Sequence, residues 1–306
     1  MKTLRVRIYE NDFLQDFTDR YYQMPRKQLI ETFLPKTFKY EIVPIEEKAD
    51  ICLCGIQTDQ YTNLRSDEIN FLICVENCPK WKHYKHYNTY NDFGDNRIQL
   101  YSYNHHSKPY LSDRFISIPT IFFRLNYYLQ VSSFYKSQPF LQTKFADKKF
   151  ALITNKSALN KDIYKFASKI KHIGKIDHIG MHDDKVLHTS CYNSLELLQV
   201  YNQYKFIFCF ENSYQPGYIT EKIFNGLLSN SIPIYCGAPD ISEFIDTSGF
   251  ININPTSIDT IDTTYISELA SNENKYNELL NKNKVNIQAA AIATLAMQKI
   301  AERICS

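Results

Sequence analysis

Short apolar runs recur along this chain, and longer polar or amphipathic segments separate them. Seven of these runs are brief and rich in β-branched or aromatic side chains, which is typical of buried β-strands. They comprise residues 5–9, 50–56, 70–75, 150–154, 204–210, 232–235 and 250–253. We expect the first three runs to form one sheet and the last four to form a second.

Two segments between the later strands carry apolar residues at helical spacing, residues 161–170 and residues 221–228. Strands that are almost continuously apolar and alternate with helices favour parallel sheets covered on both faces. The pattern therefore predicts an α/β fold with two Rossmann-like domains facing a cleft.

A polar stretch at residues 132–149 is the expected join between the two domains. It divides the chain into a first domain over residues 1–145 and a second over residues 146–283. The last segment, residues 284–306, is rich in alanine and predicts a helix with Ile300 on its apolar face. We expect this helix to pack back on the domains, with contact to a membrane surface as the alternative.

The composition, 44% hydrophobic and 22% charged over 306 residues, is that of a folded globular protein. A net charge of +2 does not by itself indicate a nucleic-acid partner. No uninterrupted apolar stretch reaches about 18 residues, and the charged N-terminus is unlike a signal peptide. The eight cysteines form no CxxC pair, which favours buried free thiols over a zinc site. These features predict a cytoplasmic location, with at most peripheral contact with the inner membrane.

The chain has only eight glycines, and neither a G-x-G-x-x-G fingerprint nor a P-loop occurs. A dinucleotide-dependent oxidoreductase and a P-loop nucleotide hydrolase are therefore disfavoured. Residues 79–90 interleave lysine and histidine with tryptophan and tyrosine, a composition that could stack single-stranded nucleic acid. A solvated loop beside an acceptor site is the favoured interpretation, and we expect no nucleic-acid partner.

The segment at residues 210–237 holds the densest candidate chemistry. An apolar strand ends at Phe210, polar residues follow, and a helix begins near Thr220, which is a suitable N-cap residue. Ligands of open α/β sheets bind at the carboxyl ends of strands, where the next helix offers free N–H groups and its positive end. Lys222 is unfavourable beside that positive end and therefore indicates a nearby anionic group; a solvated lysine is the alternative.

The sequences FENSYQPGYITEK (residues 210–222) and SIPIYCG (residues 231–237) resemble the signature of the α1,3-fucosyltransferases of glycosyltransferase family 10. The resemblance implies a GT-B fold with GDP-fucose bound to the second domain. It also implies that Glu221 hydrogen-bonds the ribose and that Lys222 neutralises the diphosphate. The remaining residues implied for the donor site are Asn212, Tyr218 and Thr220.

The resemblance extends upstream over residues 150–180, where Lys161 occupies the position at which family members usually carry an arginine toward the phosphates. Lysine keeps the charge but lacks the bidentate fork. Gly217 is a second departure, because an acid commonly precedes the tyrosine in the family. These departures leave another GDP-sugar open as the donor.

The sequence holds no acidic D-x-D motif that would place a metal ion between phosphates. Lys222 could substitute for a divalent cation, because it would stabilise the negative charge that develops on departing GDP. The resemblance therefore implies that no cofactor is required and that Mn²⁺ or Mg²⁺ at most stimulates the enzyme.

Two segments of the first half also resemble the family. FLICVENCP (residues 71–79) is similar to its E-N-x-x-P segment, and residues 112–128 are similar to its D-R-Y/F segment. The resemblance implies that Glu76 is the catalytic base, which removes a proton from an acceptor hydroxyl as that oxygen attacks the anomeric carbon. A single displacement of this kind inverts the configuration of the sugar.

The expected function is the transfer of fucose from GDP-fucose to O3 of N-acetylglucosamine in a glycan, for instance that of a lipopolysaccharide. An α1,4 linkage and a GT-B transferase that uses a different GDP-sugar remain open. A non-catalytic carbohydrate- or nucleic-acid-binding protein is the third alternative.

Overall fold

A computed structural model describes residues 3–9, 26–55, 65, 67–74, 97–101, 115–117, 143–154, 161–179, 195–282 and 287–306. The chain divides into two compact units. The first unit comprises Met1–Phe123 together with Ala290–Ser306, and the second comprises Arg124–Ala289.

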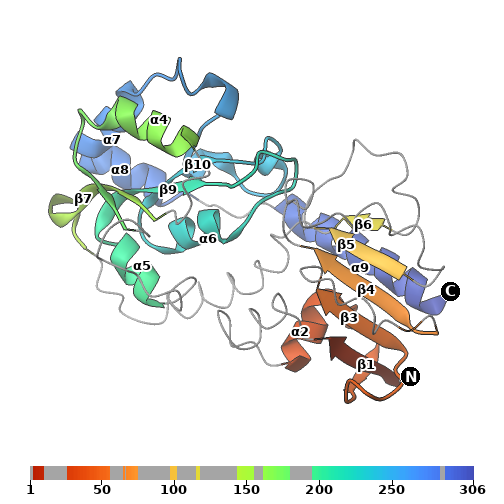
Figure 1. Ribbon diagram of the computed structural model, residues 1–306. Coiled ribbons are helices and arrows are strands. Elements are labelled where there is room, and N and C mark those ends of the chain that lie inside the picture. Colours follow the sequence, from red (N-terminus) through yellow and green to blue (C-terminus); the bar gives the residue numbers. More distant parts are fainter. Residues whose placement is uncertain are drawn as a thin grey trace. The chain divides into compact units, whose positions relative to one another are not determined.

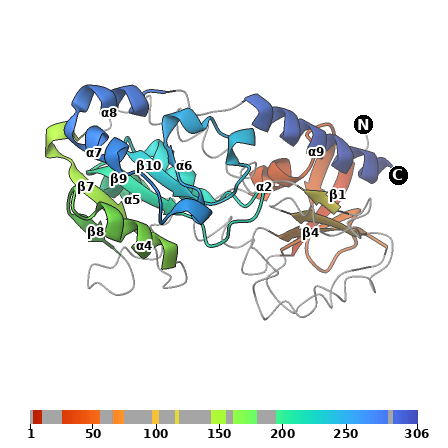
Figure 2. The same ribbon diagram turned by 90° about the horizontal axis from the view of Figure 1, so that it is seen from above.

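The first unit is built on a six-stranded sheet in the order β2-β1-β3-β4-β5-β6, and every pairing is parallel (Figure 1). The strands are β1 (Thr3–Tyr9), β2 (Lys39–Ile42), β3 (Ile51–Gly55), β4 (Ile69–Cys74), β5 (Arg97–Tyr101) and β6 (Phe115–Ser117). Helices α2 (Arg26–Phe33) and α9 (Ile287–Cys305) accompany it. Both views show α9 running along the sheet (Figures 1 and 2), and its Ile300 is fully buried.

The second unit is built on a five-stranded parallel sheet in the order β11-β10-β9-β7-β8. Its strands are β7 (Lys149–Ile153), β8 (Ile176–His178), β9 (Tyr204–Phe210), β10 (Ile232–Cys236) and β11 (Ile251–Asn252). Its helices are α4 (Lys161–Ile170), α5 (Leu195–Tyr201), α6 (Glu221–Leu228), α7 (Thr264–Ser271) and α8 (Glu273–Leu280). Four single-turn 3₁₀ helices are η5 (Phe145–Asp147), η7 (Ile241–Glu243), η8 (Thr247–Gly249) and η9 (Pro255–Ser257).

Helices cover both faces of the second sheet. Successive side chains of a strand point to opposite faces, so the contacts of β9 show which helices lie on which face. Phe206, Phe208 and Phe210 of β9 pack in one core cluster with residues of α4, α7 and α8. On the other face, a Cβ added to Gly226 of α6 would lie 2.8 Å from the Cys209 sulfur of β9. α6 therefore approaches the sheet so closely that only glycine fits there. Figure 1 shows this division of the helices between the two faces.

The seven predicted strands and three predicted helices are confirmed. The ranges predicted for β9, α4 and α6 are also their observed bounds. Among the cysteines that the structure describes, Cys52, Cys54, Cys209 and Cys236 are buried thiols, as expected. None of the described helices is long and apolar enough to cross a bilayer.

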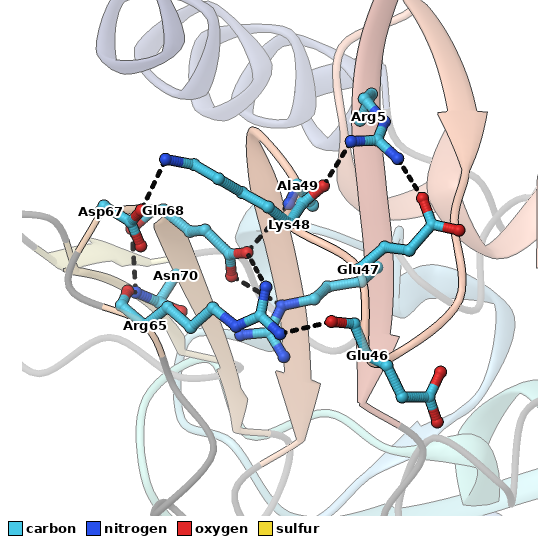
Figure 3. Close-up of polar contacts among 10 residues, drawn as sticks. Arg5, Glu46, Glu47, Lys48, Ala49, Arg65, Asp67, Glu68 and Asn70 are labelled. Atoms are coloured by element: carbon cyan, nitrogen blue, oxygen red, sulfur yellow. Dashed lines mark hydrogen bonds and ion pairs between the residues drawn. The ribbon is translucent and has the colours of Figure 1, made fainter.

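A buried ion pair lies at the amino-terminal edge of the first sheet. Nε of Arg7, on β1, donates to Oε2 of Glu68 at 2.6 Å, and the two side chains are 1% and 0% exposed. The other carboxylate oxygen of Glu68 accepts from the N–H of Ala49 at 2.9 Å. Figure 3 shows the charged residues around this carboxylate, which include Arg65 and Lys48. Because Ala49 and Glu68 precede β3 and β4, the cluster lies at the edge opposite to the carboxyl ends of the strands.

A single buried lysine holds helix ends in the second unit. The Lys148 ammonium donates to the carbonyl oxygens of Asn202 at 2.5 Å and Asn230 at 2.9 Å, just beyond the ends of α5 and α6. Carbonyls at helix C-termini lack intrahelical partners and carry the negative end of the dipole, so a cation is favourable there. Burial lowers the pKa of Lys148 to about 8.

Candidate functional site

The strand order of the second sheet identifies where a ligand would bind. The chain runs from β7 outward to β8, then returns to β9 on the other side of β7 and continues to β10 and β11. In such sheets, ligands occupy the crevice outside the carboxyl ends of the strands at this switch point. α4 follows β7 and α6 follows β9, and the two helices cover opposite faces (Figure 1). Their amino ends, with their positive dipole ends, therefore lie at the same edge of the sheet.

Glu211 is the first residue after β9 and is completely buried. Its N–H donates to the carbonyl oxygen of Cys236 at 2.8 Å, which keeps it beside the end of β10. One carboxylate oxygen accepts from the N–H of Thr220 at 2.7 Å, and the other accepts from the Thr220 hydroxyl at 2.6 Å. These charge-assisted hydrogen bonds tie the start of α6 to the end of β9.

Lys222 completes this network. Its ammonium lies 3.0 Å from Thr220 Oγ1, 3.3 Å from Glu211 Oε2 and 3.5 Å from Glu221 Oε1. The side chain is 22% exposed. The structure therefore supplies an anionic neighbour from the protein itself, and the alternative of a freely solvated lysine is wrong.

Thr220 occupies the N-cap position of α6 with extended backbone angles, as predicted. Its side chain does not make the capping hydrogen bond to a helix N–H. Its hydroxyl instead donates to the buried Glu211 carboxylate at 2.6 Å and accepts from the Lys222 ammonium at 3.0 Å.

Burial raises the pKa of Glu211, and the nearby Lys222 ammonium opposes this shift. The same dry surroundings raise the pKa of Tyr235, whose hydroxyl accepts from the N–H of Ala238 at 3.0 Å. Gly237 lies between these two side chains: an added Cβ would be 2.3 Å from the Tyr235 hydroxyl and 2.5 Å from Glu211 Cγ. The glycine that ends the signature is thus required by close packing around Glu211.

Gly217, a departure from the family pattern, has a backbone reason. Its φ is 73°, in the left-handed region that side-chain-bearing residues rarely adopt. Its N–H donates to Asp240 Oδ1 at 2.7 Å, which fixes the loop between β9 and α6. An acid at this position would need a different loop conformation.

The loop after β9 also contacts the first turn of α4. The Tyr214 hydroxyl donates to Asp162 Oδ2 at 2.8 Å. Lys161, the preceding residue, is exposed and has no ion-pair partner among the described residues. The contact between Tyr214 and Asp162 keeps the start of α4, and with it Lys161, at the same edge of the sheet as Lys222.

The other predicted residues differ in exposure. Asn212 is exposed directly beside Glu211, and Glu221 is partly exposed in the first turn of α6. Tyr218, in contrast, is only 1% exposed and packs inside the unit. Glu76 lies outside the described residues.

Sequence reasoning missed the residues that organise the site, Glu211, Asp162 and Tyr214. Glu211 carried a usable signal, because an acid that directly follows an almost continuously apolar strand sits at the ligand-binding edge. The described residues contain no group of three or more His, Cys, Asp or Glu side chains that could hold a metal ion.

Comparison with known proteins matches the second half of the chain to a family. The sequence profile for the C-terminal region of glycosyltransferase family 10 (fucosyltransferase) matches residues 143–306. The α-(1,3)-fucosyltransferase FucT of Helicobacter pylori is 35% identical over 101 residues, which are 33% of this chain and 21% of that enzyme. The matched segment thus spans about a fifth of the relative's length.

Solved structures match nearly the whole chain. A crystal structure of an α1,3-fucosyltransferase has a TM-score of 0.67 at 17% identity, covering 99% of this chain and 90% of the other. A crystal structure of an α1,3-fucosyltransferase with GDP-fucose has a TM-score of 0.65 at 16% identity, with 100% and 92% covered. At such identities the likeness concerns the fold, which is the GT-B fold that the sequence predicted.

Proposed function

The chain belongs to glycosyltransferase family 10, the fucosyltransferases, and from this premise we propose that it transfers fucose from GDP-fucose to a hydroxyl of a glycan. We further propose that the acceptor atom is O3 of N-acetylglucosamine and that the reaction inverts the configuration at the anomeric carbon. The family membership supports the transferase activity, and the geometry of the second unit supports an anionic nucleotide donor.

The observation that carries the proposal is the pair of lysines at the switch point. Lys161 begins α4 and Lys222 lies in the first turn of α6. A cation at a helix amino end is unfavourable, because the helix dipole is positive there. Glu211 and Glu221 compensate part of the Lys222 charge, whereas Lys161 has no ion-pair partner among the described residues. Two cations at one edge of the sheet favour an anionic ligand there, and the diphosphate of a GDP-sugar is such a group.

In this proposal each predicted residue has a task. Glu221 accepts hydrogen bonds from the ribose hydroxyls, and Asn212 offers its exposed amide to the donor. Thr220 holds the start of α6 in place, and the buried Tyr218 forms the packed wall behind it. Lys222 and Lys161 neutralise the diphosphate.

Lys222 also contributes to the chemical step, because it stabilises the charge that develops on GDP as the glycosidic bond breaks. A required metal ion is therefore not part of the proposal, although Mn²⁺ or Mg²⁺ could stimulate the reaction. Glu76 acts as the base that takes the proton from the acceptor hydroxyl, which attacks the face of the sugar opposite to GDP.

Two measurements test the function. Calorimetry with GDP and GDP-fucose should show binding to the wild-type protein, with GDP-mannose as the donor control. GDP release from GDP-fucose should then depend on an acceptor such as N-acetyllactosamine, with the type 1 disaccharide testing the α1,4 linkage. Binding of single-stranded oligonucleotides without any GDP affinity would contradict the proposal.

A further inference from the structure

We propose that Glu211 is a positioning residue, whose buried carboxylate holds the Lys222 ammonium at the amino end of α6, where a diphosphate would meet it. This inference rests on the proposed function, because it assigns the device that prepares Lys222 for an anionic ligand. It names a residue outside the set that the family signature assigned to donor binding.

The geometry of the network supports this role. Glu211 is 0% exposed and is fixed by its own N–H bond to Cys236 and by two hydrogen bonds from Thr220. Lys222 is 22% exposed, with its ammonium 3.3 Å from the Glu211 carboxylate. The Glu211 carboxylate is therefore buried and held in place, while the Lys222 side chain that it contacts remains partly exposed to solvent.

A held lysine binds an anion better than a free one. A lysine side chain has high rotamer entropy, and fixing it on ligand binding costs free energy. Contact with Glu211 and Thr220 fixes the ammonium before the ligand arrives. The buried position of Glu211 strengthens the attraction, because charges in a dry interior are less screened than at the surface.

The proposal makes a prediction opposite in sign to that of simple electrostatics. A carboxylate near a diphosphate repels it, so loss of the Glu211 charge would by itself tighten GDP binding. Displacement of the Lys222 ammonium from its position would instead weaken GDP binding. The direction of the change therefore identifies which role Glu211 has.

Glu211→Gln is the sharpest variant. With its amide oxygen toward the Thr220 N–H, the new NH₂ group faces Thr220 Oγ1, which can accept a hydrogen bond. It also faces the Lys222 ammonium, which cannot accept. The substitution thus keeps the Thr220 contacts and specifically displaces Lys222.

The experiment is a double-mutant cycle on GDP affinity, measured by calorimetry with wild type, Glu211→Gln, Lys222→Met and the double variant. We expect Glu211→Gln to weaken GDP binding roughly fivefold in the wild-type background, as for one side chain that binding must newly immobilise. In the Lys222→Met background it should change binding less than about twofold. In turnover, the KM for the donor should rise while the KM for the acceptor stays unchanged.

Ser231→Ala is the matched control, because Ser231 is fully buried in the same unit and donates to the carbonyl oxygens of Tyr201 and Tyr204 without contacting Lys222. It should lower stability and leave GDP affinity unchanged. Unchanged or tighter GDP binding by Glu211→Gln overturns the inference, as does an equal loss in both backgrounds. Absence of GDP binding to the wild-type protein is a different result, because it overturns the proposed function before any variant is made.

Discussion

Both sheets bury a carboxylate against a cation, but the two pairs differ in position and in exposure. In the first unit, Glu68 precedes β4 and pairs with Arg7, and neither side chain is more than 1% exposed. In the second unit, Glu211 follows β9 and pairs with Lys222, which is 22% exposed. We call the Arg7–Glu68 pair closed, because both of its side chains are buried; the further cation beside Glu68, Arg65, is 35% exposed but lies at the edge opposite to the carboxyl ends of the strands. We call the Glu211–Lys222 pair open, because its cation reaches solvent at the edge where ligands bind.

The difference shows that a buried ion pair alone does not indicate a functional site. In the closed pair, the two buried charges compensate each other and Glu68 also contacts Arg65 and the backbone, so the pair contributes to the fold. The open pair combines a fixed anion with a cation that can still accept a ligand. The edge of the parallel sheet decides between the two roles, because only the carboxyl ends of the strands border the switch-point crevice.

The largest expected effects are a loss of turnover from a change in the first unit and a loss of GDP binding from a change in the second. Glu76→Ala, in the first unit, should lower turnover by about 10²–10⁴-fold, as expected for loss of a general base, and should leave GDP binding intact. Lys222→Met, in the second unit, should weaken GDP binding by roughly tenfold to a hundredfold, because a charge-assisted contact is lost. GDP-release kinetics and calorimetry on both variants measure the split. Near wild-type turnover by Glu76→Ala would contradict the base assignment.

The next prediction concerns the closed pair. Arg7→Met should lower the free energy of unfolding by about 3 kcal/mol, because it leaves the buried Glu68 carboxylate with Arg65 as its cation, which is 3.6 Å away and 35% exposed. Urea denaturation measures the change. Lys48→Met is the control: it removes a cation from the same cluster, but its pair with Asp67 is exposed, so stability should not change measurably. A small effect of Arg7→Met would show that the first pair is not closed as described.

Gly237→Ala tests the packing that supports the open pair. Its new Cβ would displace the Tyr235 hydroxyl and the Glu211 side chain, so we expect a loss of about 1–3 kcal/mol in stability and weaker GDP binding. Gly226→Ala is the matched control, because its Cβ would collide with Cys209 and Pro233 instead. It should cost similar stability without changing GDP affinity. Equal GDP affinities for the two variants would contradict a role for Gly237 in the site.

The sequence allowed much of the fold to be predicted, because interior strands of a parallel sheet are almost continuously apolar. β9, for example, reads YKFIFCF, and its bounds were predicted correctly. The edge strands β2, β6 and β8 were missed, because an edge strand need not be long or apolar: β2 is KYEI and mostly exposed, β6 is FIS and β8 is IDH. The interior strand β5 was missed too, because its sequence RIQLY is interrupted by polar residues. Their identity as strands depends on pairing with distant neighbours.

The site was predictable to a lesser degree. The family signature pointed to Thr220, Glu221 and Lys222, which the structure places together at the start of α6. It did not reveal that Glu211 holds two of them, because a signature does not tell which of its residues point inward. The contact between Asp162 and Tyr214 joins residues 52 positions apart, and such contacts depend on tertiary structure.

Lys148 is another buried cation, but its partners are backbone carbonyl oxygens rather than a carboxylate. Its pKa is about 8 in the folded protein and 10.5 in the reference state, so the unfolded chain binds more protons between these values. Stability should therefore rise with pH from about 8 toward 10.5, by about 1–2 kcal/mol once the stabilising carbonyl contacts are allowed for. Urea denaturation between pH 7.5 and 9.5 should show this rise in the wild type and a flatter profile in Lys148→Met. Parallel profiles would contradict the shift.

The smallest effect concerns the exposed cation at the switch point. Lys161→Arg restores the planar fork that can bind two phosphate oxygens at once, so GDP-fucose affinity should improve by roughly threefold. Lys161→Met should weaken it by a similar factor, since the site is solvated and charges are partly screened. Lys165→Met is the control, because Lys165 is also exposed on α4 but pairs with Asp259 at 2.6 Å. If arginine does not improve binding while methionine weakens it, Lys161 acts as a point charge, and the open edge attracts the diphosphate mainly through its net positive potential rather than through a shaped contact.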